Sequence, residues 1–553
     1  MAEQNASPLP AGLSWLHAPV GARGAMVVSA AALAGLSLLL GRPAIQGPPV
    51  APHIFEYLFH RNEPAAAWLA LAILVAATIA ARSGRFPERL LVSRLTASPK
   101  EFVAAVTVVL AAAALLVYRA HPLSMDEYAP LFQARVFARG HLAAQVPPEL
   151  VPRLVPPIRW FLESSPSGAM LSAYWPGFAL LLTPFVWLGC PWLLNPLLGG
   201  AVLLLVWRLA RRLWPQTDAP GWAVLFTAAS PAFSVNAISY YSMNAHLAAS
   251  LCFATLVLER RLFLAGAVGS LAFALHNPFP HLLFAIPFIA WLAWQPGRIR
   301  AGLRLAAGYA PGLIVLVGGW MWCRARFTAP VETQGGLLAG LEVVRRYAFT
   351  APSLDLLVAR TMSLAELASW AVPLLLPLAV FGAVRCRANT GARLVALAAL
   401  LTGLGYLFVP YDQGHGWGYR YFHSAWGALP LLAAGALEST SLAAPVRKLA
   451  VGAALLSLVL CTSLRFAQVR SFMDAHLSQL PPAAAERGRE VIFVDPRRGS
   501  YSVDLVQNDP FLDNDRWILL SHGDAQDARF MHAFFPRSRR TLSGPVASLW
   551  VVR

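Results

Sequence analysis

The sequence predicts an all-α polytopic membrane protein with about thirteen transmembrane helices, interfacial helices at the outer face and a small C-terminal α/β domain. Hydrophobic residues make up 57% of the 553 residues and charged residues only 13%, about half of the roughly 25% that is usual in soluble domains. Apolar runs of nearly membrane-spanning length recur along the chain. From Asp474 onward charge rises, and turn residues separate short β-like runs.

The individual spans follow from the length that a helix needs to cross the hydrocarbon layer, about 20 mostly apolar residues at about 1.5 Å each. Two longer apolar stretches are expected to form helical hairpins, which turn near Ser239–Asn244 and at His276–His281. The predicted spans are 25–40, 65–81, 102–118, 193–207, 219–236, 245–258, 262–276, 281–294, 305–322, 363–384, 394–409, 424–438 and 449–464.

The distribution of arginines predicts the orientation. Positive charges follow alternate spans, whereas the turns at 237–246 and 276–281 contain no arginine or lysine. By the positive-inside rule the arginine-rich loops face the cytoplasm, so segment 176–190 must not cross, and we expect it to be an interfacial helix at the outer face. The segments that face outward, where function is to be sought, are 119–192, 323–362, 410–423 and 465–553.

Charge and motif content exclude several functions. The formal net charge is +17, but the basic residues are scattered between apolar runs, which argues against nucleic acid as a partner. Neither Lys100 nor Lys448 is followed by Ser or Thr, so no phosphate-binding loop of the Gly-rich type is present. The five cysteines lie far apart, which suits neither a zinc site nor a disulfide framework.

The first candidate site is the carboxylate pair Asp126 and Glu127, just after a predicted span. Such a pair beside the membrane surface is a candidate general base, or a candidate oxygen-ligand set for a divalent cation. The alternative is that Asp126 only caps a helix and Glu127 only favours its positive end. In the stretch that follows, Tyr128, Leu131 and Phe132 share one apolar face, so we expect a helix that lies flat on the membrane.

The second candidate site is segment 411–423, in which three glycines alternate with aromatic residues around Arg420. Glycines allow a ligand to approach the backbone, and arginine can bind a phosphate through two hydrogen bonds. The alternative is an aromatic interfacial belt with a snorkelling arginine. Six histidines also lie near outer ends of spans, where imidazoles can form hydrogen bonds to a phosphate or a sugar: His121, His246, His276, His281, His415 and His423.

Six short motifs follow one another in a characteristic order: Ser124–Tyr128, Tyr174–Gly177, Asn195–Gly199, Ala210–Leu213, Gly416–Tyr421 and Asn508–Pro510. By these motifs, residues 101–553 resemble the GT-C superfamily of integral membrane glycosyltransferases, in a bacterial branch similar to protein O-mannosyltransferases and aminoarabinose transferases. Family members often carry a proline where this chain has Trp175, and another where it has Tyr419. These two departures leave the substrate class open.

The resemblance divides the chain into three parts. Residues 1–100 form a cytosolic N-terminus with two extra spans, which lie outside the resemblance. Residues 101–464 form the GT-C-like transmembrane catalytic module, and residues 465–553 form a small soluble domain at the outer face. The implied location is the bacterial inner membrane, with the N-terminus in the cytoplasm and the C-terminus in the periplasm.

The resemblance also implies a reaction. The donor is a polyprenyl-phosphate-linked sugar, transferred on the outer face to a hydroxyl of an unidentified glycan, lipid or protein acceptor, with inversion and without an organic cofactor. Asp126 is the expected base, and Glu127 orients it, holds the acceptor or shares a divalent cation with it. Arg420 is the expected phosphate ligand. His246, His276, His415 and Tyr421 are further candidates for donor binding.

Two other functions remain open from the sequence. One is a flippase or transporter of lipid-linked glycans, which places essential charges along a central cavity. Within the predicted spans the sequence contains essentially one such charge, Glu366, which disfavours a carrier. The other is an outer-face glycan ligase or polymerase, which relies on arginine and histidine without a carboxylate base.

Overall fold

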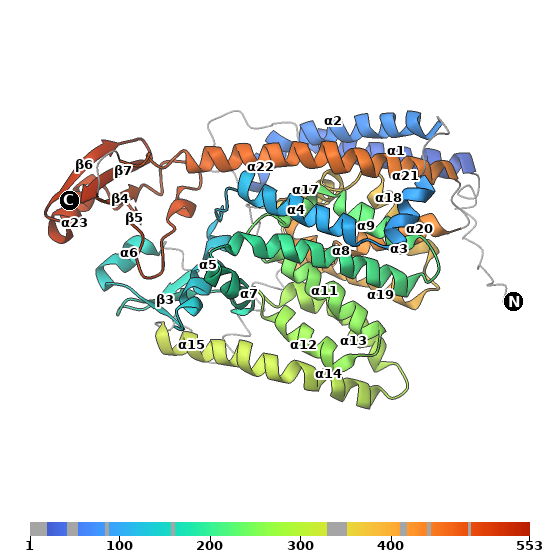
Figure 1. Ribbon diagram of the computed structural model, residues 1–553, viewed down its shortest axis with the longest axis horizontal. Helices are drawn as coiled ribbons and strands as arrows, with labels where there is room; N and C mark the ends of the chain where they lie inside the picture. The colour runs from blue at the N-terminus through green and yellow to red at the C-terminus, as the bar shows by residue number, and fades with distance from the viewer. Residues whose placement is uncertain are drawn as a thin grey trace.

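Most helices run side by side along the long axis of the computed structural model, and a small sheet domain lies beyond one end of them (Figure 1). The described residues are 19–40, 54–82, 88–155, 161–328, 351–409, 417–439, 444–484 and 488–552. The helices of the membrane part are α1 (Pro19–Leu40), α2 (Ile54–Arg82), α3 (Glu88–Ala97), α4 (Lys100–Leu116), α8 (Leu194–Leu213), α9 (Ala219–Ala228), α10 (Pro231–Asn236), α11 (Met243–Leu258), α12 (Leu262–Phe273), α13 (Phe279–Ala293), α14 (Arg298–Gly312), α15 (Gly319–Phe327), α17 (Leu354–Ser369), α18 (Leu375–Arg385), α19 (Thr390–Gly405), α20 (Ala428–Glu438), α21 (Ala444–Leu456) and α22 (Thr462–Leu477).

All thirteen predicted spans fall on helices, which confirms the all-α polytopic fold class. Within the described residues, 5 helices are long and apolar enough to cross a membrane. The pair α3 and α4, bent by 91°, is a sixth candidate, and shorter apolar helices of 10–17 residues accompany them. These helices make the chain a multi-pass membrane protein.

Two predicted spans are interrupted at prolines. The run at 219–236 breaks after Ala228, and Pro231 begins α10 at a position where its missing N–H costs nothing. The run at 363–384 breaks between α17 and α18, at a segment that contains Pro373. These breaks let short helices pack at angles that one straight span does not allow.

A small outer layer separates the membrane helices from the sheet domain. Its elements are α5 (Met125–Ala138), β1 (Ala144–Gln145), α6 (Val151–Leu154), β2 (Leu162–Ser164), β3 (Ala169–Ser172) and α7 (Gly177–Trp187). The three strands form an antiparallel sheet in the order β1-β3-β2. Helix α7 occupies the segment predicted as an interfacial helix.

The prediction that the helix after Asp126 lies flat on the membrane is wrong. Leu131 packs into the core of the membrane helices, whereas Tyr128 and Phe132 pack against Phe493 and Trp550 of the sheet domain. Protein therefore covers the apolar surface of α5 on both sides. The spacing of apolar residues reveals that a face is buried, but it does not distinguish lipid from another domain.

The C-terminal domain is the small α/β unit that the sequence predicts. Its elements are β4 (Arg489–Val494), β5 (Arg516–Leu520), α23 (Asp524–Phe534), β6 (Ser538–Ser543) and β7 (Ala547–Val552), and the sheet has the order β5-β4-β7-β6. Residues alternate between two buried faces of the sheet: Val491 and Phe493 face α5, and Ile492 and Val494 lie in a second core. Strand β6 was missed because it is a polar, largely exposed edge.

Candidate active site

The structure brings Asp126 and Arg420 into direct contact, although 294 residues separate them in the sequence. Arg420 Nη1 donates to Asp126 Oδ2 over 3.1 Å, and the two side chains are only 4% and 7% exposed. Asp126 lies in the first turn of α5, and Arg420 begins the short 3-10 segment Arg420–Ala425 that leads into α20. The acid at the start of α5 and the cation before α20 thus form one buried site.

Local backbone geometry orients the side chains of Asp126 and Arg420 toward each other. Ser124 is extended and ends the loop before α5, and the N–H of Met125 donates to the carboxylate of Asp504 in the C-terminal domain over 2.9 Å. On the other side, Gly418 has a φ of +75°, and a Cβ there would lie 3.2 Å from the Trp370 ring. Only glycine fits this crowded left-handed turn, which sets the direction of the chain into Arg420.

Two tyrosines complete the surroundings of the ion pair. The hydroxyl of Tyr174 donates to Asp126 Oδ1, and the guanidinium of Arg420 lies 4.7 Å from the centre of the Tyr241 ring. Burial, reinforced by the Asp126 carboxylate, raises the pKa of Tyr174 well above its usual value, so its hydroxyl stays a donor. Tyr174 belongs to a motif that the sequence analysis singled out, whereas nothing in the sequence pointed to Tyr241.

Glu127 has a different role from its neighbour. Its carboxylate accepts hydrogen bonds from the N–H groups of Leu123 (2.5 Å), Ser124 (3.2 Å) and Tyr240 (2.9 Å), and from the Tyr118 hydroxyl (2.8 Å). Burial raises the pKa of Glu127 to about 7, while these four donors act in the opposite direction. Glu127 therefore fastens the start of α5 to the turn that carries Tyr241.

This geometry does not fit a divalent cation shared by Asp126 and Glu127. Four protein donors already occupy the carboxylate of Glu127, and Arg420 and Tyr174 occupy that of Asp126. Among the residues that the structure describes, no group of three or more His, Cys, Asp or Glu side chains is placed to hold a metal ion. We therefore derive no step through a metal.

His276 and His246 lie on the side of the site formed by the helical hairpins. The His276 ring lies 4.0 Å from the ring of Tyr174 and interacts electrostatically with Asp126 and Arg420. Burial lowers the pKa of His276 to about 4, so its imidazole is neutral at pH 7. His246, at the start of α11, is buried and close enough to His276 and His423 to interact with them electrostatically.

Several buried polar atoms around this site have no hydrogen-bond partner within the described part of the chain. Such atoms are uncommon in folded proteins, because each costs about 1–3 kcal/mol when nothing compensates for its desolvation. Helix α11 packs directly against the 3-10 segment that carries Arg420, and most of these atoms belong to the two elements. They are Ser242 Oγ, Asn244 Oδ1, His246 Nε2, His423 Nε2 and Ser424 Oγ.

The remaining predicted site residues are placed as follows. The Tyr421 ring stacks on Tyr406 at 4.5 Å, and the Arg360 guanidinium lies 4.9 Å from its centre, so Tyr421 packs beside the site. His281 pairs with the Tyr309 hydroxyl at 2.6 Å and is used in helix packing. His415 lies outside the described residues. The donor-binding roles of His246, His276, His415 and Tyr421 stay predictions.

The contacts of Glu127 lead to a stability prediction. In Glu127→Gln an amide replaces one acceptor oxygen and places N–H groups against N–H donors, which costs about 1–3 kcal/mol. We expect a lower melting temperature in detergent and a smaller loss of sugar transfer than for Asp126→Asn. Tyr118→Phe, which removes one of the four donors, is the matched milder variant. Unchanged melting of Glu127→Gln would contradict the scaffold role.

Comparison with known proteins identifies the fold. No family model matches the sequence, and no curated protein does. Among solved structures, ArnT from Cupriavidus metallidurans bound to undecaprenyl phosphate aligns with a TM-score of 0.50 at 13% identity, covering 81% of this chain and 97% of that chain. The apo state of the same ArnT aligns with a TM-score of 0.49, 13% identity and the same coverage. The alignment to the ArnT bound to undecaprenyl phosphate shows that this chain shares its fold, in agreement with the resemblance that the sequence motifs indicated.

Proposed function

We propose that this protein is a membrane glycosyltransferase that takes a sugar from a polyprenyl-phosphate donor and transfers it to an acceptor hydroxyl at the outer face of the bacterial inner membrane. The contact between Asp126 and Arg420 carries the proposal, because it joins a candidate base to a candidate phosphate ligand in one buried site. The fold supports it, since one of the structures of similar fold is an ArnT bound to undecaprenyl phosphate.

The reaction assigns one task to each member of the pair. The carboxylate of Asp126 takes the proton of the acceptor hydroxyl, whose oxygen forms the new bond to the anomeric carbon. The bond between that carbon and the phosphate oxygen breaks, and the polyprenyl phosphate leaves with the electron pair. Arg420 stabilises the negative charge of the leaving phosphate through its fork of N–H groups. Displacement in line inverts the anomeric centre.

The ion pair also couples donor binding to base activation. Before the donor binds, Arg420 and Tyr174 hold both oxygens of the Asp126 carboxylate, which leaves it less accessible to an acceptor hydroxyl. A phosphate beside Arg420 competes for the guanidinium and frees Asp126 Oδ2. The carboxylate oxygen thus becomes available to the acceptor when the leaving group is in place.

The polar atoms without partners provide a place for the sugar. His246, His423 and Asn244 offer neutral donors and acceptors that suit hydroxyl groups better than charges. His276 is neutral at pH 7 and lies beside Tyr174, where it can contact a sugar without competing with Arg420 for the phosphate.

The experiment is transfer from synthetic polyprenyl-phosphate sugars by the purified protein in detergent or nanodiscs. We expect a glycosylated product and free polyprenyl phosphate in equal amounts, and an inverted anomeric configuration by NMR. Movement of the intact lipid-linked glycan across a vesicle membrane, with no sugar transfer, would replace the transferase by the flippase.

A further inference from the structure

The two N-terminal helices, which lie outside the family resemblance, contribute a charge to the interior of the bundle. Glu63 of α2 and Arg465 of α22 form an ion pair in which both side chains are only 1% exposed. Arg465 Nη1 and Nη2 donate to the two carboxylate oxygens of Glu63 over 2.9 and 2.7 Å. Both residues lie just outside the predicted spans 65–81 and 449–464, and the sequence alone does not indicate that they pair.

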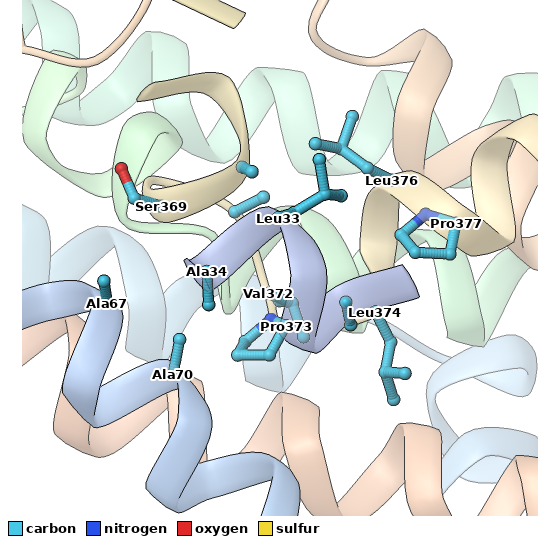
Figure 2. Close-up of a pocket in the computed structure, with 13 residues that line it drawn as sticks. Leu33, Ala34, Ala67, Ala70, Ser369, Val372, Pro373, Leu374, Leu376 and Pro377 are labelled. Carbon is cyan, nitrogen blue, oxygen red and sulfur yellow. The ribbon is translucent and has the colours of Figure 1, made fainter. Parts of the chain in front are cut away.

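Small side chains let the extra helices approach closely enough for this contact. Figure 2 shows Ala34, Ala67 and Ala70 of α1 and α2 beside Pro373 and Leu374, at the break between α17 and α18. The cavity left between them is only about 20 Å³, about the space of one water molecule. Helices α1 and α2 therefore pack closely against the break between α17 and α18, although a cavity of about 820 Å³ lies farther along α1, between it and these two helices.

The ion pair holds one tryptophan on several sides. The indole N–H of Trp370 donates to Glu63 Oε1 over 2.9 Å, and the Arg465 guanidinium lies 4.0 Å from the centre of the indole ring. Arg465 also donates to the backbone oxygen of Ser369 over 3.2 Å, and the Ser369 hydroxyl bonds to Glu63. Because Trp370 directly follows α17, these contacts fix the end of that helix.

Trp370 in turn forms the wall against which the Arg420 segment turns. A Cβ at Gly418 would touch the Trp370 ring, and the rings of Trp370 and Trp417 lie 6.4 Å apart. The indole N–H of Trp417 donates over 3.0 Å to the hydroxyl of Tyr118, which itself donates to Glu127. The segment that begins at Trp417 therefore connects the ion pair to Arg420 on one side and to the start of α5 on the other.

We infer that Glu63 and Arg465 are positioning residues for the proposed transfer reaction, which act through Trp370 and Gly418 on the placement of Arg420. This inference rests on the proposed function for its kinetic consequences. It gives α1 and α2 a role: they supply the carboxylate that holds Trp370 against the turn into the phosphate-binding arginine.

The test uses the double variant Glu63→Gln, Arg465→Met, because removing one partner alone leaves an uncompensated buried charge. Removal of a whole buried pair is often tolerated, so we expect a folded protein. The matched control is Asp527→Asn, Arg153→Met, which removes a buried ion pair at the junction with the sheet domain, in which the Asp527 and Arg153 side chains are 3% and 7% exposed.

Two readouts separate positioning from general destabilisation. Hydrogen–deuterium exchange is expected to rise at residues 417–425 in the test variant and to stay at the wild-type level there in the control. The value of kcat/KM for the donor is expected to fall about tenfold, within the range of coupling that remote residues carry. In an Arg420→Lys background the same double substitution is expected to lower kcat/KM for the donor by less than about twofold. If the ion pair acts through Arg420, its effect and that of the Arg420 substitution are not additive.

Hydrogen–deuterium exchange at the wild-type level at residues 417–425 in the test variant would overturn the inference. So would a combined variant whose loss in kcat/KM equals the product of the losses of Arg420→Lys and of the double substitution. The proposed function fails separately. If the wild-type protein transfers no sugar from any polyprenyl-phosphate donor, the exchange experiment still decides whether the ion pair holds the Arg420 segment.

Discussion

Replacing Asp126 by asparagine is expected to lower kcat for sugar transfer by about a thousandfold, within the range of roughly 10² to 10⁴ that a general base contributes. Asparagine keeps the shape of the side chain, but its single carbonyl oxygen replaces only one of the two acceptor atoms that Arg420 and Tyr174 contact, and the amide cannot take the acceptor proton. Initial rates at saturating donor and acceptor measure the loss. Undecaprenyl phosphate binding, measured in parallel, is expected to be retained or to tighten, because the neutral amide competes less with the phosphate for the Arg420 guanidinium.

The control for this variant is Asp524→Asn, because the Asp524 side chain is 79% exposed in the C-terminal domain. It removes the same charge from the outer part of the protein without touching the site, so transfer should continue at the wild-type rate. Full activity of Asp126→Asn would remove Asp126 from the role of base. If Asp126→Asn were fully active but Arg420→Ala were inactive, a glycan ligase without a carboxylate base would explain the results better than the proposed transferase.

The second large effect is expected at Arg420. Arg420→Ala removes the phosphate ligand, and it also leaves the buried carboxylate of Asp126 without its cation, a change that typically costs about 3–5 kcal/mol. We expect a lower melting temperature and a loss of at least about a hundredfold in kcat/KM for the donor. Arg420→Lys restores the charge but not the planar fork, so it should recover stability more than transfer.

Melting curves and donor titrations on both variants separate the two contributions. Arg498→Ala serves as the control, since the Arg498 side chain is 72% exposed and pairs with Asp495 in the C-terminal domain. Equal donor kinetics for Arg420→Lys and the wild-type protein would show that a point charge suffices. Unchanged kinetics for Arg420→Ala would contradict its role as phosphate ligand.

Most of the membrane helices could be predicted from the sequence, because each one is a long run of apolar residues. The arrangement of the candidate active site was less predictable. The start of α5 and the glycine-rich turn before Arg420 each had a local signal, but their contact depends on how the bundle packs. The same limit explains Tyr241, whose position in a charge-free turn carries no chemical signal, and which reaches Arg420 only in three dimensions.

Two charged residues show why the predicted span boundaries differ from the ends of the helices. Glu63 and Arg465 lie just beyond the apolar runs at 65–81 and 449–464, so hydropathy excluded them, yet α2 begins at Ile54 and α22 continues to Leu477. Each charge is costly inside the bundle alone, and their pairing offsets that cost. A single-sequence pattern does not contain that pairing.

The most direct test of the account is an experimental structure of the protein with undecaprenyl phosphate. The account predicts the phosphate within hydrogen-bond distance of the Arg420 guanidinium, with the contact between Arg420 and Asp126 lengthened and a carboxylate oxygen of Asp126 open to an acceptor. A phosphate bound away from Arg420, with that ion pair left intact, would contradict it.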